Sequence, residues 1–205
     1  MKTTHTWLAA AICALAATLP TTAAADDDDA ISVVYSGPVT ANTRAAPTTT
    51  AFADWCAASG APACLPTTQF PVFDTHTGKR KGMAYIWGAF PFNGGTGFYA
   101  GSICFSEFMV FALEGGEVHV HTAKNGTCGA FMDPALKPPL HPELGATAVI
   151  AGGGDGVIAG GTGRFKGWKG TFTDRVFVGF GAPNSGVGGI IYYDQLLFRI
   201  SPKGD

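Results

Sequence analysis

The sequence has few charged residues and no cluster of basic ones. Only 14% of its 205 residues are charged, the formal net charge is -2, and the lysines and arginines are scattered along the chain. A protein that binds nucleic acid or an anionic membrane presents a concentrated positive surface. We therefore expect no nucleic-acid partner.

The signature motifs of several enzyme classes are also missing. The chain contains no G-x-S-x-G, no H-E-x-x-H, no Walker G-K-[ST] and no C-x-x-C. These absences argue against a serine hydrolase, a zinc protease, a P-loop nucleotide enzyme and a paired-cysteine zinc or redox site. His119 and His121 could share a face of a strand and hold zinc, but no motif supplies a third ligand, so we favour a polar outer face. We expect no metal and no cofactor.

No segment is long and apolar enough to suggest a transmembrane helix. The apolar run from Trp7 to Leu19 follows Lys2 and precedes the small residues Ala23 to Ala25. This order is typical of a secretory signal peptide, which we place at residues 1–25. We expect a secreted or periplasmic protein that does not insert into the membrane.

Four cysteines follow the leader, and an even number in an oxidising compartment predicts two disulfides with three possible pairings. We favour Cys56–Cys64 and Cys104–Cys128. A hairpin turning at residues 114–117 would bring Cys104 diagonally opposite Cys128, and one bulge or small slip would join their sulfurs.

Residues 26–69 begin with an acidic run and are otherwise rich in Thr, Ala and Pro. We interpret them as an irregular arm pinned by Cys56–Cys64, with one short strand in AISVVYSG. The alternative for the later part is a short helix around TTAFADWCAAS, with Trp55 packed on the main domain.

From residue 70 to 205 the composition changes. Runs of β-branched and aromatic residues are separated by Gly, Asn and Asp, and apolar residues do not recur with the 3.6-residue period of a helix. Eight or so strands with short turns predict an all-β domain, an antiparallel barrel or sandwich. One expected turn lies at KNG around Asn125, which is also a glycosylation sequon if the source is eukaryotic.

Residues 149–170, VIAGGGDGVIAGGTGRFKGWKG, are rich in glycine. Gly154 to Ala159 fit the dinucleotide fingerprint G-x-G-x-x-A, but that motif needs a helix after it, and GGTG cannot start one. We instead predict two short strands joined by a glycine turn, with a second reversal at GGTG.

The segment GGTGRFKGWKG, Gly160 to Gly170, resembles the signature hairpin of the allene oxide cyclase and dirigent barrels. PVFDTHTGKRKGMAYIWG resembles the dirigent opening through Val72, Phe73, Asp74 and Gly82, and GSIC is similar to a cyclase Gly-x-Cys with one extra residue. The resemblance covers about residues 70 to 200 and implies an eight-stranded antiparallel, calycin-type barrel.

Members of that family enclose an apolar cavity, are often trimeric, and steer or cyclise reactive organic molecules without a cofactor. The resemblance thus implies a small apolar organic ligand and a possible homotrimer. The alternatives are a cofactor-independent isomerase or cyclase, and a structural or host-interaction protein that uses the barrel as a scaffold.

Asp74 matches the dirigent aspartate regarded as an acid in the cavity, where burial would raise its pKa. Its alternative role is to bond its own backbone in the turn that follows. Lys169 stands where dirigents carry an arginine. A lysine there keeps the positive charge but lacks the planar guanidinium group of arginine, which can make two parallel hydrogen bonds.

Glu107 and Asp194 stand inside apolar runs and could serve a ligand, although we favour an outward or subunit-contact position for each. Tyr192 could act as a phenolic acid. Tyr85, Trp87 and Phe108 are candidate ligand contacts, with ordinary strand packing as the alternative for any aromatic residue in this region.

Overall fold

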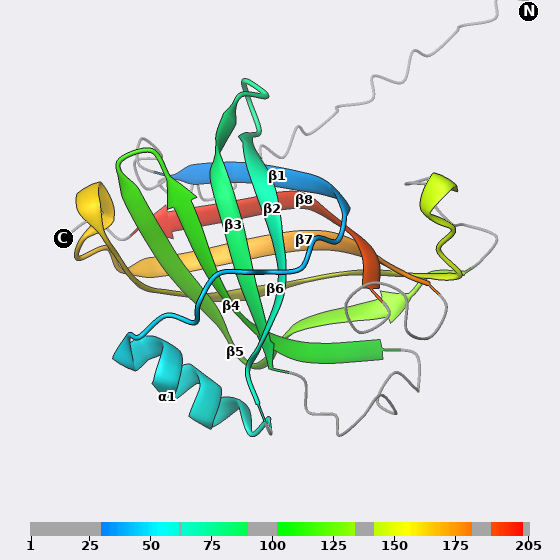
Figure 1. The fold of residues 1–205 in the computed structure, drawn as a ribbon, viewed down its shortest axis with the longest axis horizontal. Coiled ribbons are helices and arrows are strands. Elements are labelled where there is room, and N and C mark those ends of the chain that lie inside the picture. The colour runs from blue at the N-terminus through cyan, green and yellow to red at the C-terminus, as the bar shows by residue number, and fades with distance from the viewer. Residues whose placement is uncertain (1–29, 62, 90–101, 134–141, 182–189, 203–205) are drawn as a thin grey trace, which may run out of the picture.

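The structure is a computed structural model that describes residues 30–61, 63–89, 102–133, 142–181 and 190–202. Its eight strands close into a barrel in chain order, with antiparallel pairing between every pair of neighbours, including the first strand and the last (Figure 1). The prediction of an eight-stranded antiparallel β-barrel is therefore confirmed. The predicted signal peptide lies outside the described residues.

The strands are β1 (Ile31–Pro38), β2 (Leu65–Asp74), β3 (Arg80–Ala89), β4 (Ser102–Leu113), β5 (Gly116–Phe131), β6 (Ala148–Gly161), β7 (Gly170–Phe180) and β8 (Ile190–Pro202). The helical elements are α1 (Thr50–Ser59), η3 (Pro142–Leu144) and η4 (Gly163–Phe165). The barrel thus begins well before residue 70, because β1 and the first half of β2 belong to its wall. The strand expected in AISVVYSG is β1.

The two turns expected inside β5 and β6 are not there, and each of these strands runs on through its glycines. A register shift between Thr122 and Thr127 lets β5 bend against β6 instead of ending. The glycines serve close packing of the two strands: a Cβ on Gly152 would lie 2.4 Å from the carbonyl oxygen of Cys128. The reversal expected at GGTG is present, as η4.

The two ends of the barrel differ. Short connections join β2 to β3, β4 to β5 and β6 to β7 at one end, which we call the turn end. The connections that leave β1, β3, β5 and β7 are longer. The ends of these four strands lie toward the right and bottom of Figure 1, and we call this end of the barrel the loop end.

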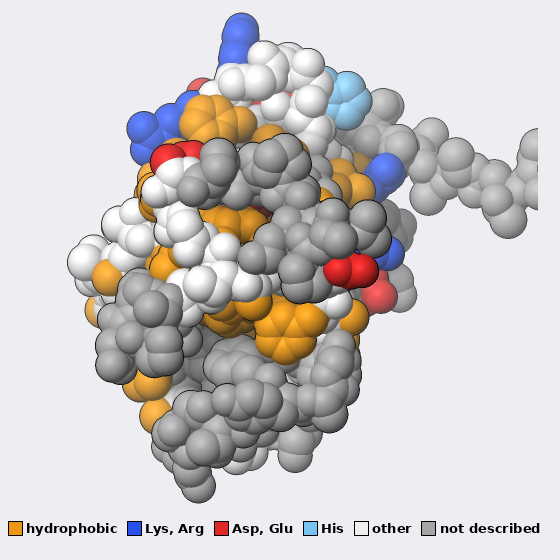
Figure 2. All heavy atoms as spheres, turned by 90° about the vertical axis from the view of Figure 1, so that its right-hand side faces the viewer, with side chains coloured by type: hydrophobic (Ala, Val, Ile, Leu, Met, Phe, Trp, Pro, Cys, Tyr) orange, Lys and Arg blue, Asp and Glu red, His pale blue; other side chains and the backbone are white. Residues whose placement is uncertain are grey.

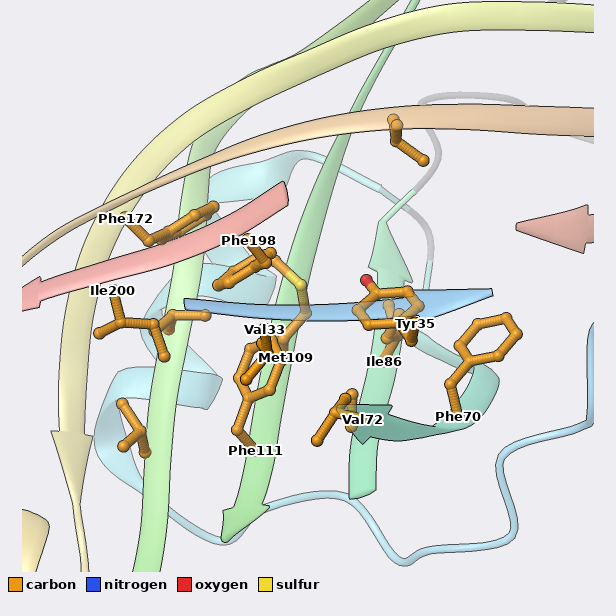
Figure 3. Close-up of a cluster of buried hydrophobic side chains, with 14 of the residues drawn as sticks. Val33, Tyr35, Phe70, Val72, Ile86, Met109, Phe111, Phe172, Phe198 and Ile200 are labelled. Carbon is orange, nitrogen blue, oxygen red and sulfur yellow. The ribbon is translucent and has the colours of Figure 1, made fainter. Parts of the chain in front are cut away.

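Side chains fill the interior between β1 and the neighbouring strands (Figure 3). The ring of Phe198 stacks on Phe172 with centroids 4.8 Å apart and tilts against Phe111 at 4.6 Å. Gly156 makes room for this layer, since a Cβ there would lie 2.2 Å from the ring of Phe172. The turn-end half of the interior is consequently a packed apolar core.

Helix α1 confirms the helical alternative for the arm. The hydroxyl of Thr49 caps its first turn, and Gly60 ends it with a φ of 69°, a left-handed value that glycine adopts without strain. Phe52 and Trp55 cover the barrel's outer face, where the ring of Phe108 lies 5.0 Å from that of Phe52. The helix therefore closes over one side of the barrel wall.

Both predicted disulfides are present, Cys56–Cys64 and Cys104–Cys128. Cys104 and Cys128 stand directly opposite each other on β4 and β5, because a register shift between Phe105 and Phe108 slides the strands by the amount that the hairpin needs. The first bridge ties α1 to the start of β2.

Candidate functional site

An apolar pocket opens at the loop end of the barrel. The space it encloses is small, about 20 Å³, and reaches about 360 Å³ only when the open mouth is counted. The apolar side chains that line it are Phe105, Ile150, Val176, Val178, Phe180 and Ile190, and Thr127 adds a hydroxyl. Figure 2 views the molecule from this side and shows hydrophobic side chains gathered on it. The lining residues that the structure describes therefore suit an apolar group.

Glu107 lies further inside the barrel than the pocket. It is on β4, on the same face of the strand as the lining residue Phe105 and two positions after it. Its side chain is 3% exposed. One carboxyl oxygen, Oε1, accepts a hydrogen bond of 3.2 Å from the hydroxyl of Tyr193, and Oε2 accepts one of 3.1 Å from the hydroxyl of Thr127. Thr127 thus joins the pocket wall to the buried carboxyl.

The environment of Glu107 keeps it protonated. Burial raises the pKa of its carboxyl to about 8, the nearby Asp174 raises it further, and the hydrogen bonds from Thr127 and Tyr193 oppose the rise. A carboxylic acid at neutral pH in an apolar setting can donate a proton or a hydrogen bond. The expectation that Glu107 faces outward is wrong, because Phe108 next to it takes the outer face beneath α1.

Asp174 occupies the matching depth on β7, two positions before Val176. Its oxygen Oδ1 accepts a hydrogen bond from the backbone N–H of Gly154, and its Oδ2 has no hydrogen-bond partner within the described chain. Burial raises the pKa of Asp174 to about 6, and the charge of Asp155 adds to the rise, whereas the Gly154 bond, Arg175 and a side-chain hydrogen bond with Gln195 lower it. The group is therefore mostly ionised at neutral pH.

Tyr35 brings a third polar group from β1 into the same layer. Its ring stacks on Phe70 with centroids 5.0 Å apart, and its hydroxyl, buried and without a partner among the described residues, points away from Phe70 (Figure 3). Burial raises the pKa of Tyr35 well above its usual value, and the charges of Glu107 and Asp174 raise it further. The hydroxyl therefore stays protonated.

We call Glu107, Asp174, Tyr35 and Tyr193 the acid cluster. All four are at most 3% exposed. They come from strands β1, β4, β7 and β8, so only closure of the barrel brings them together. The arrangement can hold a proton at Glu107 and offers a carboxylate oxygen and a phenol to a bound group.

Asp74 lies at the opposite end of the barrel, as the last residue of β2. Its Oδ1 accepts hydrogen bonds from the backbone N–H of His76 and from both the N–H and the hydroxyl of Thr77, and its Oδ2 lies 3.3 Å from Lys81. The Thr77 bonds lower the pKa of Asp74 to about 2. This is the alternative turn role, and the expected rise in pKa is not found.

The other predicted acids and bases do not join the acid cluster. Lys169 is exposed at the turn end, just before β7. Tyr192 and Asp194 are buried on the face of β8 opposite Tyr193, and the hydroxyl of Ser36 donates a hydrogen bond to Asp194. Burial, then Asp194, raises the pKa of Tyr192.

The predicted ligand contacts Tyr85, Trp87 and Phe108 pack on the outer face of the barrel wall. Trp87 and Phe108 lie beneath α1, and the guanidinium of Arg44 sits 5.0 Å above the ring of Tyr85. None of these three side chains lines the loop-end pocket. Their apolar character serves the attachment of the arm.

His119 and His121 also lie on this outer face, as favoured. His119 is 3.2 Å from Glu117, which also holds Arg44 at 2.8 Å, and the ring of His121 stacks on Phe108. Among the residues that the structure describes, no three histidine, cysteine or acidic side chains form a group able to hold a metal ion.

The sequence analysis missed Asp174, Tyr35 and Thr127 as site residues. The signal for Asp174 is its alternation with Phe172, Val176 and Val178, which places a carboxyl on the apolar side of β7. Tyr35 likewise alternates with Val33. Which face of a strand points into the barrel depends on how the neighbouring strands pair with it. The sequence of a single strand does not specify that pairing.

Comparison with protein-family models, curated proteins and solved structures finds no match for this chain. The resemblance at Gly160–Gly170 and around Asp74 therefore stays a prediction, although the barrel it implies is present. In the part of the chain that the structure describes, no helix has the length and hydrophobicity needed to cross a bilayer.

Proposed function

We propose that this chain is a secreted β-barrel protein that binds a small apolar organic molecule in its loop-end pocket. The observation that carries the proposal is the pocket itself, an apolar hollow at the mouth of a barrel, which is a common place for ligand sites. Val176 and Val178 line one side of it and Phe105 another. The acid cluster beneath adds a few polar groups that can orient a ligand.

Two further observations support the proposal. The two disulfides are compatible with an oxidising compartment such as the cell exterior. The resemblance of the η4 hairpin to that of allene oxide cyclases and dirigent proteins points to a barrel that handles apolar organic molecules. On this resemblance the homotrimer is also proposed.

Titration with a neutral, environment-sensitive apolar dye tests the proposal. Ile190→Trp would fill the pocket at its partly exposed rim, and we expect it to weaken dye binding at least about tenfold through loss of space. Val157→Trp, on an exposed part of β6, is the matched control and should leave binding unchanged. Absence of dye binding, or equal loss in both variants, would overturn the proposal.

A second candidate function is cofactor-free proton transfer by Glu107, favoured by its raised pKa at the pocket floor. In such a reaction the carboxylic acid gives its proton to the ligand and recovers one from another ligand atom. Deuterium from heavy water should then enter a bound unsaturated ketone with the wild type and not with Glu107→Gln. Equal incorporation by both proteins would exclude Glu107 as the acid.

A further inference from the structure

The acid cluster contains acidic groups without a basic partner. The buried residues of the described chain include no lysine or arginine, and the buried His119 lies outside the barrel wall beside Glu117. Arg175 follows Asp174 but is exposed, and its guanidinium donates to the backbone oxygen of Asp174 rather than to the carboxylate. The interior thus holds negative charge that no interior side chain neutralises.

Two atoms of the acid cluster are also left without hydrogen bonds within the described chain. They are Oδ2 of Asp174 and the hydroxyl oxygen of Tyr35, and each of these residues is 1% exposed. Buried polar atoms in folded proteins nearly always have a partner, because leaving one unmade is costly. Both atoms can therefore accept hydrogen bonds from a bound group, beside the buried Gln195 side chain that also lowers the pKa of Asp174.

The acid cluster lies next to the pocket along two strands. Val178 and Val176 line the pocket, and Asp174 follows them inward on the same face of β7. On β4 the lining residue Phe105 precedes Glu107 in the same way. A molecule whose apolar body occupies the pocket would accordingly place its inner end against the acid cluster.

We propose that the pocket takes a small apolar amine, bound as its ammonium ion with the charged head in the acid cluster. This inference rests on the proposed function. An ammonium group supplies both N–H donors and the missing positive charge, whereas a neutral hydroxyl supplies a donor alone.

Three probes with similar hydrocarbon bodies separate the possibilities: 2-phenylethylamine, 2-phenylethanol and 3-phenylpropionate. Titrated at pH 7 as competitors of the apolar dye, the amine should bind at least about tenfold more tightly than the alcohol, a ratio set by one added ion pair. The carboxylate should bind most weakly, because its charge repels Asp174.

Asp174→Asn removes the charge and keeps an oxygen for the Gly154 N–H. It should weaken amine binding at least about tenfold and leave alcohol binding within about threefold. Asp155→Asn is the control, since Asp155 is exposed on the neighbouring strand and makes the same change in net charge. Tyr35→Phe provides a second test and should also weaken the amine selectively.

The outcomes separate the inference from the proposed function. If the alcohol binds as tightly as the amine, or if Asp174→Asn keeps the preference for the amine, the inference is overturned while the proposed function stands. If neither the dye nor any probe binds, the proposed function fails and the inference with it. If Asp174→Asn does not fold, the probe ranking on the wild type and on Tyr35→Phe decides.

Discussion

Glu107 shows how one residue can carry a cost to stability that depends on pH. Its carboxyl is buried among apolar strands, and its pKa rises to about 8 from a usual value near 4.5. The folded chain therefore holds a proton that the unfolded chain releases above about pH 5. Stability associated with this proton is complete at low pH and is lost as the pH rises toward 8.

Glu107→Gln should accordingly flatten the dependence of stability on pH. Between pH 5 and 8 the wild type is expected to lose up to about 1.4 kcal/mol of unfolding free energy per pH unit from this group, with Asp174 adding a smaller loss between about 4 and 6. Denaturant unfolding at a series of pH values measures the slope. Glu114→Gln, an exposed turn position, is the control, and a variant slope equal to the wild type's would contradict the assignment.

Asp74 is the opposite case, a carboxylate that its turn stabilises in the charged form. Its lowered pKa of about 2 means that its contribution is present above about pH 4 and disappears as the pH falls through 2. Asp74→Asn should lower the melting temperature by a few degrees at pH 7 and leave dye binding unchanged. A lost binding activity with an unchanged melting temperature would instead favour the cavity role suggested by the resemblance.

Glu107 and Tyr192 were both candidates from the sequence. The sequence did not tell which of the two points into the barrel and which lies on its outer face. Both sides of β4 are apolar, because the interior takes Met109 while α1 covers Phe108. The two faces of β4 are therefore equally hydrophobic in the sequence. That Glu107 points into the barrel follows only from α1, which packs on the opposite face of the strand. Asp174 was overlooked for a different reason, because the clear alternation of β7 was not used to assign its faces.

Strand β6 shows at the scale of an element why glycine misled the prediction. Glycine is common both in turns and where two backbones approach closely, and the residue type does not distinguish the two uses. In β6 the second use applies at Gly152 and Gly156. The disulfides and the β class were predictable, by contrast, because each depends on composition and spacing alone.

Gly156→Ala should destabilise the protein by about 3 kcal/mol, since the new Cβ would lie 2.2 Å from both the Phe172 ring and the carbonyl oxygen of His121. Thermal or denaturant unfolding measures this loss. Gly78→Ala, at a φ of 64° in open space, bears only backbone strain and should cost about 1 kcal/mol. Equal losses in both variants would show that β6 does not pack as tightly as described.

At the scale of the whole molecule, the barrel depends on contacts between distant parts of the chain. Closure requires β1 to pair with β8, and the arm that follows β1 crosses the outer wall before β2 begins. Such long-range pairing is entropically costly, and cross-links that limit the unfolded chain reduce this cost.

Removing a disulfide should therefore lower stability more when the bridge closes a longer segment. Cys104 and Cys128 are 24 residues apart, and Cys56 and Cys64 are 8 apart. Replacing both Cys104 and Cys128 by serine should therefore lower the free energy of unfolding more than the same change at Cys56 and Cys64, each loss within roughly 2–4 kcal/mol. Urea unfolding of each double variant tests the order. A larger loss for Cys56–Cys64 would show that α1 contributes more to the barrel than its bridge alone suggests.

The pairing of Ile31 with Ile200 sets both ends of the described barrel side by side at the turn end. A short linker there could join the two ends, and new termini opened elsewhere would give a circular permutant with the same wall. A tether or surface attachment at either end would likewise hold the molecule with its loop end turned outward.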